Sequence, residues 1–211
     1  MNNNQVGFIH ITKSGGTNIK DKNKNRELYF GKYHNEDALY YFKKKIQCFA
    51  IVRNPIERYE SMFYYNTFGS NKYKKYNDIE DINIFVNNHF ENPEFIKKFE
   101  NGTQFRKQVS WLNDNSAYII LYDKENLVKN ITQFLLDEFS IHYAYNYNTK
   151  NINITNKKKN QKLNQNSIDK IKQLYHKDVQ LYNKLLKYQK KNHKAFCKLE
   201  ELNNDRYGID Q

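Results

Sequence analysis

The stretch Lys13-Ser14-Gly15-Gly16-Thr17 combines residue types that suit the binding of an anion. Two adjacent glycines let the backbone close around a phosphate group, and the lysine supplies a full positive charge. The threonine hydroxyl adds a further hydrogen-bond donor. Because an apolar run precedes this stretch, we expect a strand, a tight turn and then a helix whose first N–H groups point at the anion.

The order of these residues differs from that in the phosphate loop of ordinary nucleoside triphosphatases. There the lysine follows the last glycine, whereas here Lys13 precedes both glycines. The pattern therefore disfavours such an enzyme while keeping a P-loop-like strand, turn and helix. The helix is predicted to start at Thr17-Asn18, which adds Asn18 to the candidate phosphate-binding residues.

A second candidate anion site follows the apolar run at 46–52, which predicts a buried strand. Asn54 is a good helix cap and Pro55 suits the first helical position, so a helix is predicted next. Helical spacing lets Arg53 and Ser61 converge near the start of that helix. An arginine and a hydroxyl there fit a second phosphate group. The alternative is a capped helix with an exposed arginine.

The two motifs together resemble those of the sulfotransferases that use 3′-phosphoadenosine 5′-phosphosulfate (PAPS). The segment 9–17 is similar to the loop that binds the 5′-phosphosulfate in that family, and 49–58, with Ser61, is similar to its 3′-phosphate motif. The Lys-x-Gly-Gly-Thr form is closer to the carbohydrate branch, the Golgi-type enzymes that act on heparan or chondroitin. The family usually has proline where Thr12 stands.

A weaker likeness to the same branch extends from Val6 to about Leu186. The segment 105–112, which contains Gln108, is similar to a Gln-containing segment that precedes the next strand in this branch. The segment 174–182 is similar to the closing helix of the branch. We expect Asp178 on that helix to make a structural hydrogen bond.

The resemblance implies transfer of a sulfuryl group from PAPS to an acceptor hydroxyl, with 3′-phosphoadenosine 5′-phosphate (PAP) as product and no metal requirement. Lys13 would stabilise the charge on the bridging oxygen of the leaving phosphate. Arg53 and Ser61 would bind the 3′-phosphate. The cofactor-binding residues that the resemblance implies are Lys13, Ser14, Gly15, Gly16, Thr17, Asn18, Arg53 and Ser61.

The acceptor hydroxyl also needs a catalytic base. His34 lies between the two motifs, and many members of the branch have a histidine at a comparable place. The ordinary pKa of histidine lies near neutrality, which suits proton transfer. Glu36 and Asp37 are the alternative bases, and a cap or surface role is the alternative for His34.

The net charge of +12 would attract anionic partners over a distance. Candidate partners are the nucleotide donor, an acidic glycan, nucleic acid and a membrane surface. The alternative is that the charge only reflects a lysine-rich solvated surface without a specific partner. The resemblance favours a glycan hydroxyl as acceptor, and leaves peptide tyrosine, lipids and small metabolites open. We expect no specific nucleic-acid partner.

The sequence holds no run long enough to span a bilayer and no secretory signal. We therefore expect a soluble protein, cytoplasmic as the chain is written, with the Golgi lumen as its compartment only if an anchor or signal is missing. Cys48 and Cys197 give no disulfide framework, which fits a reducing compartment.

Strands that alternate with helices predict an α/β fold, a single P-loop-like domain with a central parallel sheet flanked by helices. The domain is predicted to cover 1–196, followed by a polar C-terminal tail at 197–211. The segment 145–165, rich in Asn and Lys, is either disordered or a lid over the nucleotide.

Strands are predicted near 6–11, 28–30, 46–52 and 118–122. Helices are predicted near 17–24, 35–44, 55–66, 79–90, 93–100, 124–138 and 166–190. Aromatic residues expected mainly in the core, with an adenine or sugar pocket as the alternative, are Tyr40, Tyr41, Tyr64, Tyr65 and Trp111.

Three other functions stay open at this point. A small-molecule kinase would need ATP and magnesium, and the position of Lys13 before the glycines argues against it. A nucleotide-binding protein without turnover would keep the same motifs. A nucleic-acid-binding protein would show steep salt dependence, but gives no reason for the arrangement of Arg53 and Ser61.

Overall fold

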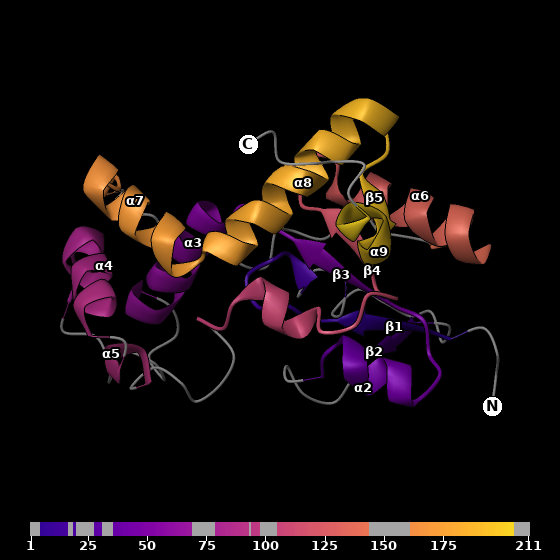
Figure 1. Cartoon of the computed structure of the whole chain (residues 1–211), viewed down its shortest axis with the longest axis horizontal. Helices are drawn as coiled ribbons and strands as arrows, with labels where there is room; N and C mark the ends of the chain where they lie inside the picture. The colour runs from indigo at the N-terminus through magenta and orange to yellow at the C-terminus, as the bar shows by residue number, and fades with distance from the viewer. Residues whose placement is uncertain are drawn as a thin grey trace.

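The apolar runs of the sequence form a central sheet, seen in a computed structural model of the chain (Figure 1). Its strands are β1 (Val6–Ile9), β2 (Leu28–Phe30), β3 (Cys48–Val52), β4 (Tyr118–Leu121) and β5 (Phe196–Lys198). Within the described residues their order is β2-β1-β3-β4-β5, and only β5 runs antiparallel to its neighbour. The structure describes residues 5–16, 19, 28–30, 36–68, 79–92, 94–97, 105–143 and 161–204.

Helices cover both faces of this sheet. On one face, α2 (Ala38–Lys43) and α8 (His176–Asn192) pack against alternate residues of β1, β3 and β4. On the other face, α6 (Leu127–Phe139) packs against the intervening residues of the same strands. Strands covered on both sides have no polar face, which explains why these segments read as continuous apolar runs. The predicted α/β fold with a helix-flanked sheet is therefore confirmed.

A separate group of helices lies beside the sheet, to its left in Figure 1. In this group α3 (Pro55–Phe68), α4 (Ile82–Glu91) and α7 (Gln165–Leu174) surround a third apolar cluster, which includes Tyr59 and Phe85. The short helix α5 (Glu94–Lys97) follows α4. The predicted cap at the start of α3 is confirmed, because Asn54 Oδ1 accepts the Ile56 N–H at 2.9 Å.

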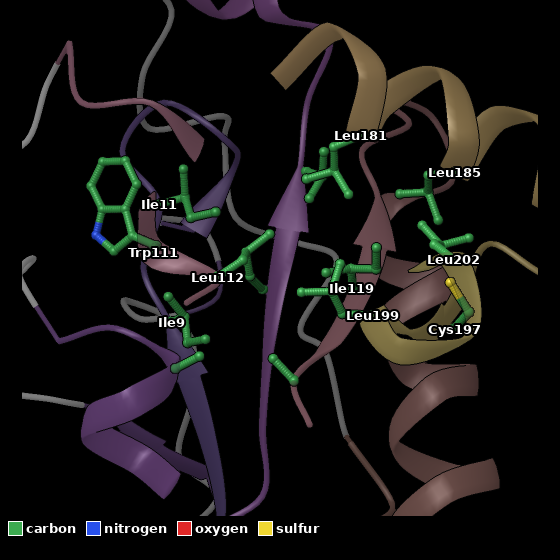
Figure 2. Close-up of a cluster of buried hydrophobic side chains, with 14 of the residues drawn as sticks. Ile9, Ile11, Trp111, Leu112, Ile119, Leu181, Leu185, Cys197, Leu199 and Leu202 are labelled. Carbon is green, nitrogen blue, oxygen red and sulfur yellow. The ribbon is translucent and has the colours of Figure 1, made fainter. Parts of the chain in front are cut away.

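The end of the described chain is folded, although the sequence predicted a polar C-terminal tail from residue 197. The boundary at 196/197 falls inside β5, and the helix α9 (Leu199–Asn203) follows at once. Figure 2 shows Leu199 and Leu202 in the same apolar cluster as Leu185 of α8. These side chains are buried, so residues 197–203 belong to the folded domain. Residues 205–211 lie outside the described part.

One further detail corrects a sequence-based prediction, and another confirms one. The single helix predicted over 166–190 is divided into α7 and α8 at Tyr175, whose hydroxyl donates to the Phe105 carbonyl at 2.8 Å. Trp111, in the 3-10 helix η2 (Gln108–Trp111), is fully buried, as is Tyr41 of α2. Both therefore belong to the core, as expected for most of the aromatic residues.

Candidate functional site

The two candidate anion loops meet at one edge of the sheet. β1 and β3 are adjacent and parallel, so the turn after β1 and the loop after β3 leave the same edge. The Nη1 of Arg53 donates to the Lys13 carbonyl oxygen at 3.1 Å. The strand order reverses direction between β1 and β3, which is where open α/β sheets bind their ligands. The turn and the guanidinium can therefore contact a single ligand.

Lys13 occupies an unusual position in this turn. Its φ of 62° lies in the left-handed region, which non-glycine residues rarely adopt. Its Nζ lies 3.9 Å from the centroid of the Tyr65 ring, a cation–π contact. Burial and then the Arg53 charge lower the pKa of the Lys13 ammonium to about 8. At neutral pH the ammonium is still mostly protonated, and it is poorly hydrated.

The two glycines of the turn are required by close packing. Gly15 has a φ of 86°, and an added Cβ would lie 2.8 Å from Cδ2 of Leu127. A Cβ on Gly16 would collide with the His10 ring. Gly16 and Ile19 both have helical backbone. The turn therefore needs glycine at both positions, since any Cβ would meet the Leu127 or His10 side chain.

The Arg53 guanidinium contacts three groups. Its guanidinium Cζ lies 4.7 Å from the centroid of the Tyr122 ring, and its Nε lies 3.4 Å from Oε2 of Glu57. The third contact is the one to the Lys13 carbonyl. Ser61 lies partly buried within α3, and its convergence with Arg53 on one ligand stays a prediction.

A buried arginine joins the first loop to the segment before η2. Arg58 of α3 donates from Nε to the Thr12 carbonyl at 2.9 Å and from Nη2 to the Thr12 hydroxyl at 3.2 Å. The same Nη2 donates to the Arg106 carbonyl at 2.9 Å. Proline, which the sulfotransferases usually have at the position of Thr12, could not supply that hydroxyl. The motif includes Arg58, but nothing in the sequence indicates that this arginine is buried.

A buried glutamine and a buried aspartate complete the support of the two loops. Gln108 contacts the backbone of Arg53 through its side chain, and Asp178 of α8 accepts the backbone N–H groups of Gln108 and Val109. The hydrogen-bonding role expected of Asp178 is therefore confirmed. Sequence reasoning gave no role to Gln108.

Several predicted site residues lie outside the described part of the chain. They include the candidate base His34, the helix-start residues Thr17 and Asn18, and all but the last residues of the 145–165 segment. Of the two alternative bases, Asp37 caps α2 by accepting the Tyr40 N–H at 3.0 Å, and it also accepts from Asn113 Nδ2 at 2.9 Å. Asp37 is thus engaged in holding α2.

Comparisons with protein-family models, with curated proteins and with solved structures found no match. Across the described residues, no three His, Cys, Asp or Glu side chains gather closely enough to hold a metal ion. In the same part of the chain, no helix has the length and apolar character needed to cross a membrane. The two motifs and the geometry of the loops that contain them are therefore the features of this chain that bear on its function.

Proposed function

We propose that this protein is a sulfotransferase that uses PAPS as donor and an acceptor hydroxyl as substrate, with a glycan as the favoured class of acceptor. The observation on which this depends is the direct contact between the Lys13 turn and the Arg53 guanidinium. Two cationic loops at one sheet edge suit a ligand with two phosphate groups, one at each end of an adenosine. We also propose that the fold is a variant of the P-loop-like architecture.

The residues of the first loop fit the 5′-phosphosulfate end of such a donor. Gly15 and Gly16 allow a tight turn packed against Leu127 and His10, and the backbone N–H groups of such a turn are the groups that would bind the anion. Lys13 offers an ammonium that is poorly hydrated, so its interaction with developing negative charge is stronger than that of an exposed lysine. When bound, the donor would supply the sulfuryl group and a phosphate as leaving group. The chain positions the reactants and stabilises charge.

The residues of the second loop fit the 3′-phosphate end. Arg53 carries its charge on a planar group that can bind a phosphate through two parallel hydrogen bonds. Its present partners are a carbonyl oxygen, a tyrosine ring and the partly exposed Glu57. A phosphate dianion is a stronger partner than these groups, and Ser61 of α3 would add a hydroxyl donor. This loop would therefore distinguish PAP from nucleotides that lack the 3′-phosphate.

Calorimetry with PAP and with adenosine 5′-phosphate tests the proposal. We expect the wild-type protein to bind PAP at least about tenfold more tightly, because one more charged group is paired. The variant R53A should lose that preference while keeping weak binding of both nucleotides. K43A is the matched control: it removes one positive charge from the exposed end of α2 and should leave the preference intact.

Two results would contradict the proposal. Equal binding of the two nucleotides by the wild-type protein would show that no site for a 3′-phosphate exists. Tight binding of ATP that depends on magnesium, without binding of PAP, would favour a small-molecule kinase. Turnover is tested separately, with PAPS and a panel of glycan acceptors.

A further inference from the structure

One side chain contacts both candidate anion loops. The Gln108 carboxamide is fully buried, and its Oε1 accepts the Arg53 N–H at 3.0 Å. Its Nε2 donates to the Arg53 carbonyl at 2.8 Å. Its Oε1 also lies 3.4 Å from the Ser14 hydroxyl, a longer and weaker contact. Gln108 thus hydrogen-bonds to the backbone at the end of β3 and also contacts the turn after β1.

The position of Gln108 is fixed in turn by α8. The Asp178 Oδ2 accepts the Gln108 N–H at 2.8 Å, and Oδ1 accepts the Val109 N–H at 3.0 Å. These N–H groups open η2, where a helix leaves its first donors without partners of its own. Burial raises the pKa of Asp178, whereas these two hydrogen bonds and the nearby Arg58 charge favour its ionised form. The aspartate therefore anchors the segment from which Gln108 extends.

We propose that Gln108 is a positioning residue, which holds the Lys13 turn and Arg53 in the relative placement that binds a two-phosphate ligand. The inference rests on the proposed function for the identity of that ligand. An amide meets the requirement at every pH, because Arg53 presents both an N–H and a carbonyl to the same side chain. A glutamate could accept but not donate, and would add negative charge beside the anion site.

Three variants separate this role from a general contribution to stability. Q108M keeps a side chain of similar length and removes both side-chain hydrogen bonds to the Arg53 backbone. Q108E keeps the acceptor for the Arg53 N–H and loses the donor. Q133M is the matched control, because Gln133 is exposed on α6, where its Nε2 donates to Asp137 Oδ1 at 2.6 Å. Each protein is studied by amide hydrogen exchange without ligand and by calorimetry with PAP.

In Q108M we expect the Arg53 amide to exchange at least about tenfold faster, because its acceptor is gone. The Tyr122 amide, which bonds to the Val52 carbonyl at the end of the same strand, should exchange at the wild-type rate. The affinity for PAP should fall about tenfold or more, since the loops no longer hold their placement. Q133M should match the wild type in both measurements.

In Q108E we expect amide exchange and PAP affinity to respond differently. The Arg53 amide should stay protected, whereas the affinity for PAP at pH 8 should fall further than in Q108M. Relative to wild type, that affinity should recover as the pH is lowered to about 5.5, because a protonated carboxyl regains a donor and loses its charge. A purely structural role would leave the pH profile of Q108E parallel to that of the wild type.

The outcomes distinguish this inference from the proposed function. If the wild-type protein does not bind PAP, the proposed function fails, and the Arg53 exchange rate in Q108M still decides whether Gln108 holds this loop. If PAP binds and Q108M shows wild-type Arg53 exchange, the positioning role is wrong. If Q108M does not fold, the pH profile of Q108E gives the decision.

Discussion

At the scale of single residues, Lys13 combines two unfavourable states. A non-glycine residue in the left-handed region costs about 1–3 kcal/mol, and a half-buried lysine loses part of its hydration. The Arg53 guanidinium donates a hydrogen bond to the Lys13 carbonyl, and the Tyr65 ring lies against the Lys13 ammonium. Such costs persist only where the surroundings impose them, and they are typical of residues that bind a ligand.

The lowered pKa of Lys13 gives a prediction on pH dependence. As the pH rises through about 8, the ammonium of the free protein loses its proton, whereas a bound phosphate favours the protonated form. The affinity for PAP should therefore fall above pH 8, by up to about tenfold per pH unit. Calorimetry at pH 7, 8, 9 and 9.5 measures this decline.

The variant K13R tests whether deprotonation of Lys13 causes that decline in affinity. Arginine stays charged over the whole range, so the variant should bind PAP with an affinity that is nearly independent of pH between 8 and 9.5. K43R, altered at an exposed position in α2, should keep the wild-type profile. A wild-type affinity that does not change up to pH 9.5 would contradict the role given to Lys13.

At the scale of elements, the C-terminal pair of β5 and α9 is part of the core. Leu202 of α9 is 1% exposed, so L202A should lower the free energy of unfolding by about 2–4 kcal/mol. L136A is the control, because Leu136 of α6 is 39% exposed and its loss should cost well under 1 kcal/mol. Urea unfolding measures both. A frayed C-terminal segment would give equal, small effects.

The sequence predicted those elements whose signals are local. Continuous apolar runs marked β1, β3 and β4, and the pair Asn54-Pro55 marked the start of α3. It missed β5, which has three residues in polar surroundings, and it missed the division at Tyr175, because the apolar spacing continues through that residue. In both cases the deciding contacts come from distant parts of the chain.

The same limit applies to the candidate site. Lys13 and Arg53 follow recognisable strands, so their convergence at one sheet edge could be predicted. Gln108 could not be given a role, since its partners Arg53 and Ser14 are 55 and 94 residues away in the sequence. The burial of Arg58 was hidden for the same reason, because its acceptor Thr12 lies 46 residues away.

At the scale of the whole molecule, the helical cluster beside the sheet contains a pair sensitive to acid. His89 of α4 is buried and stacks on Tyr59, whose hydroxyl lies 2.9 Å from its Nδ1. Burial and then the Lys107 charge lower the pKa of His89 to about 4. Between pH 6.5 and 4, the unfolded chain binds a proton here that the folded chain does not. Stability should therefore fall as the pH falls through this window.

The variant H89Q isolates that contribution. Urea unfolding at pH 7 and pH 5 should show an acid-induced loss of stability that is roughly 1–2 kcal/mol greater in the wild type than in H89Q. Glutamine can still hydrogen-bond to Tyr59 but does not titrate. H142Q, altered at an exposed histidine, should behave as the wild type does. Equal losses in wild type and H89Q would contradict the assignment.

The antiparallel pairing of β5 with β4 has a consequence for biosynthesis. Tyr118 pairs with Lys198, so the ribosome must complete α6, α7 and α8 before the partner of β4 emerges. Until then one side of β4 presents unpaired backbone groups, a template for association with other nascent chains. We therefore expect a polypeptide halted before residue 196 to bind chaperones and to aggregate when they are absent, whereas release of a few more residues closes this vulnerable edge.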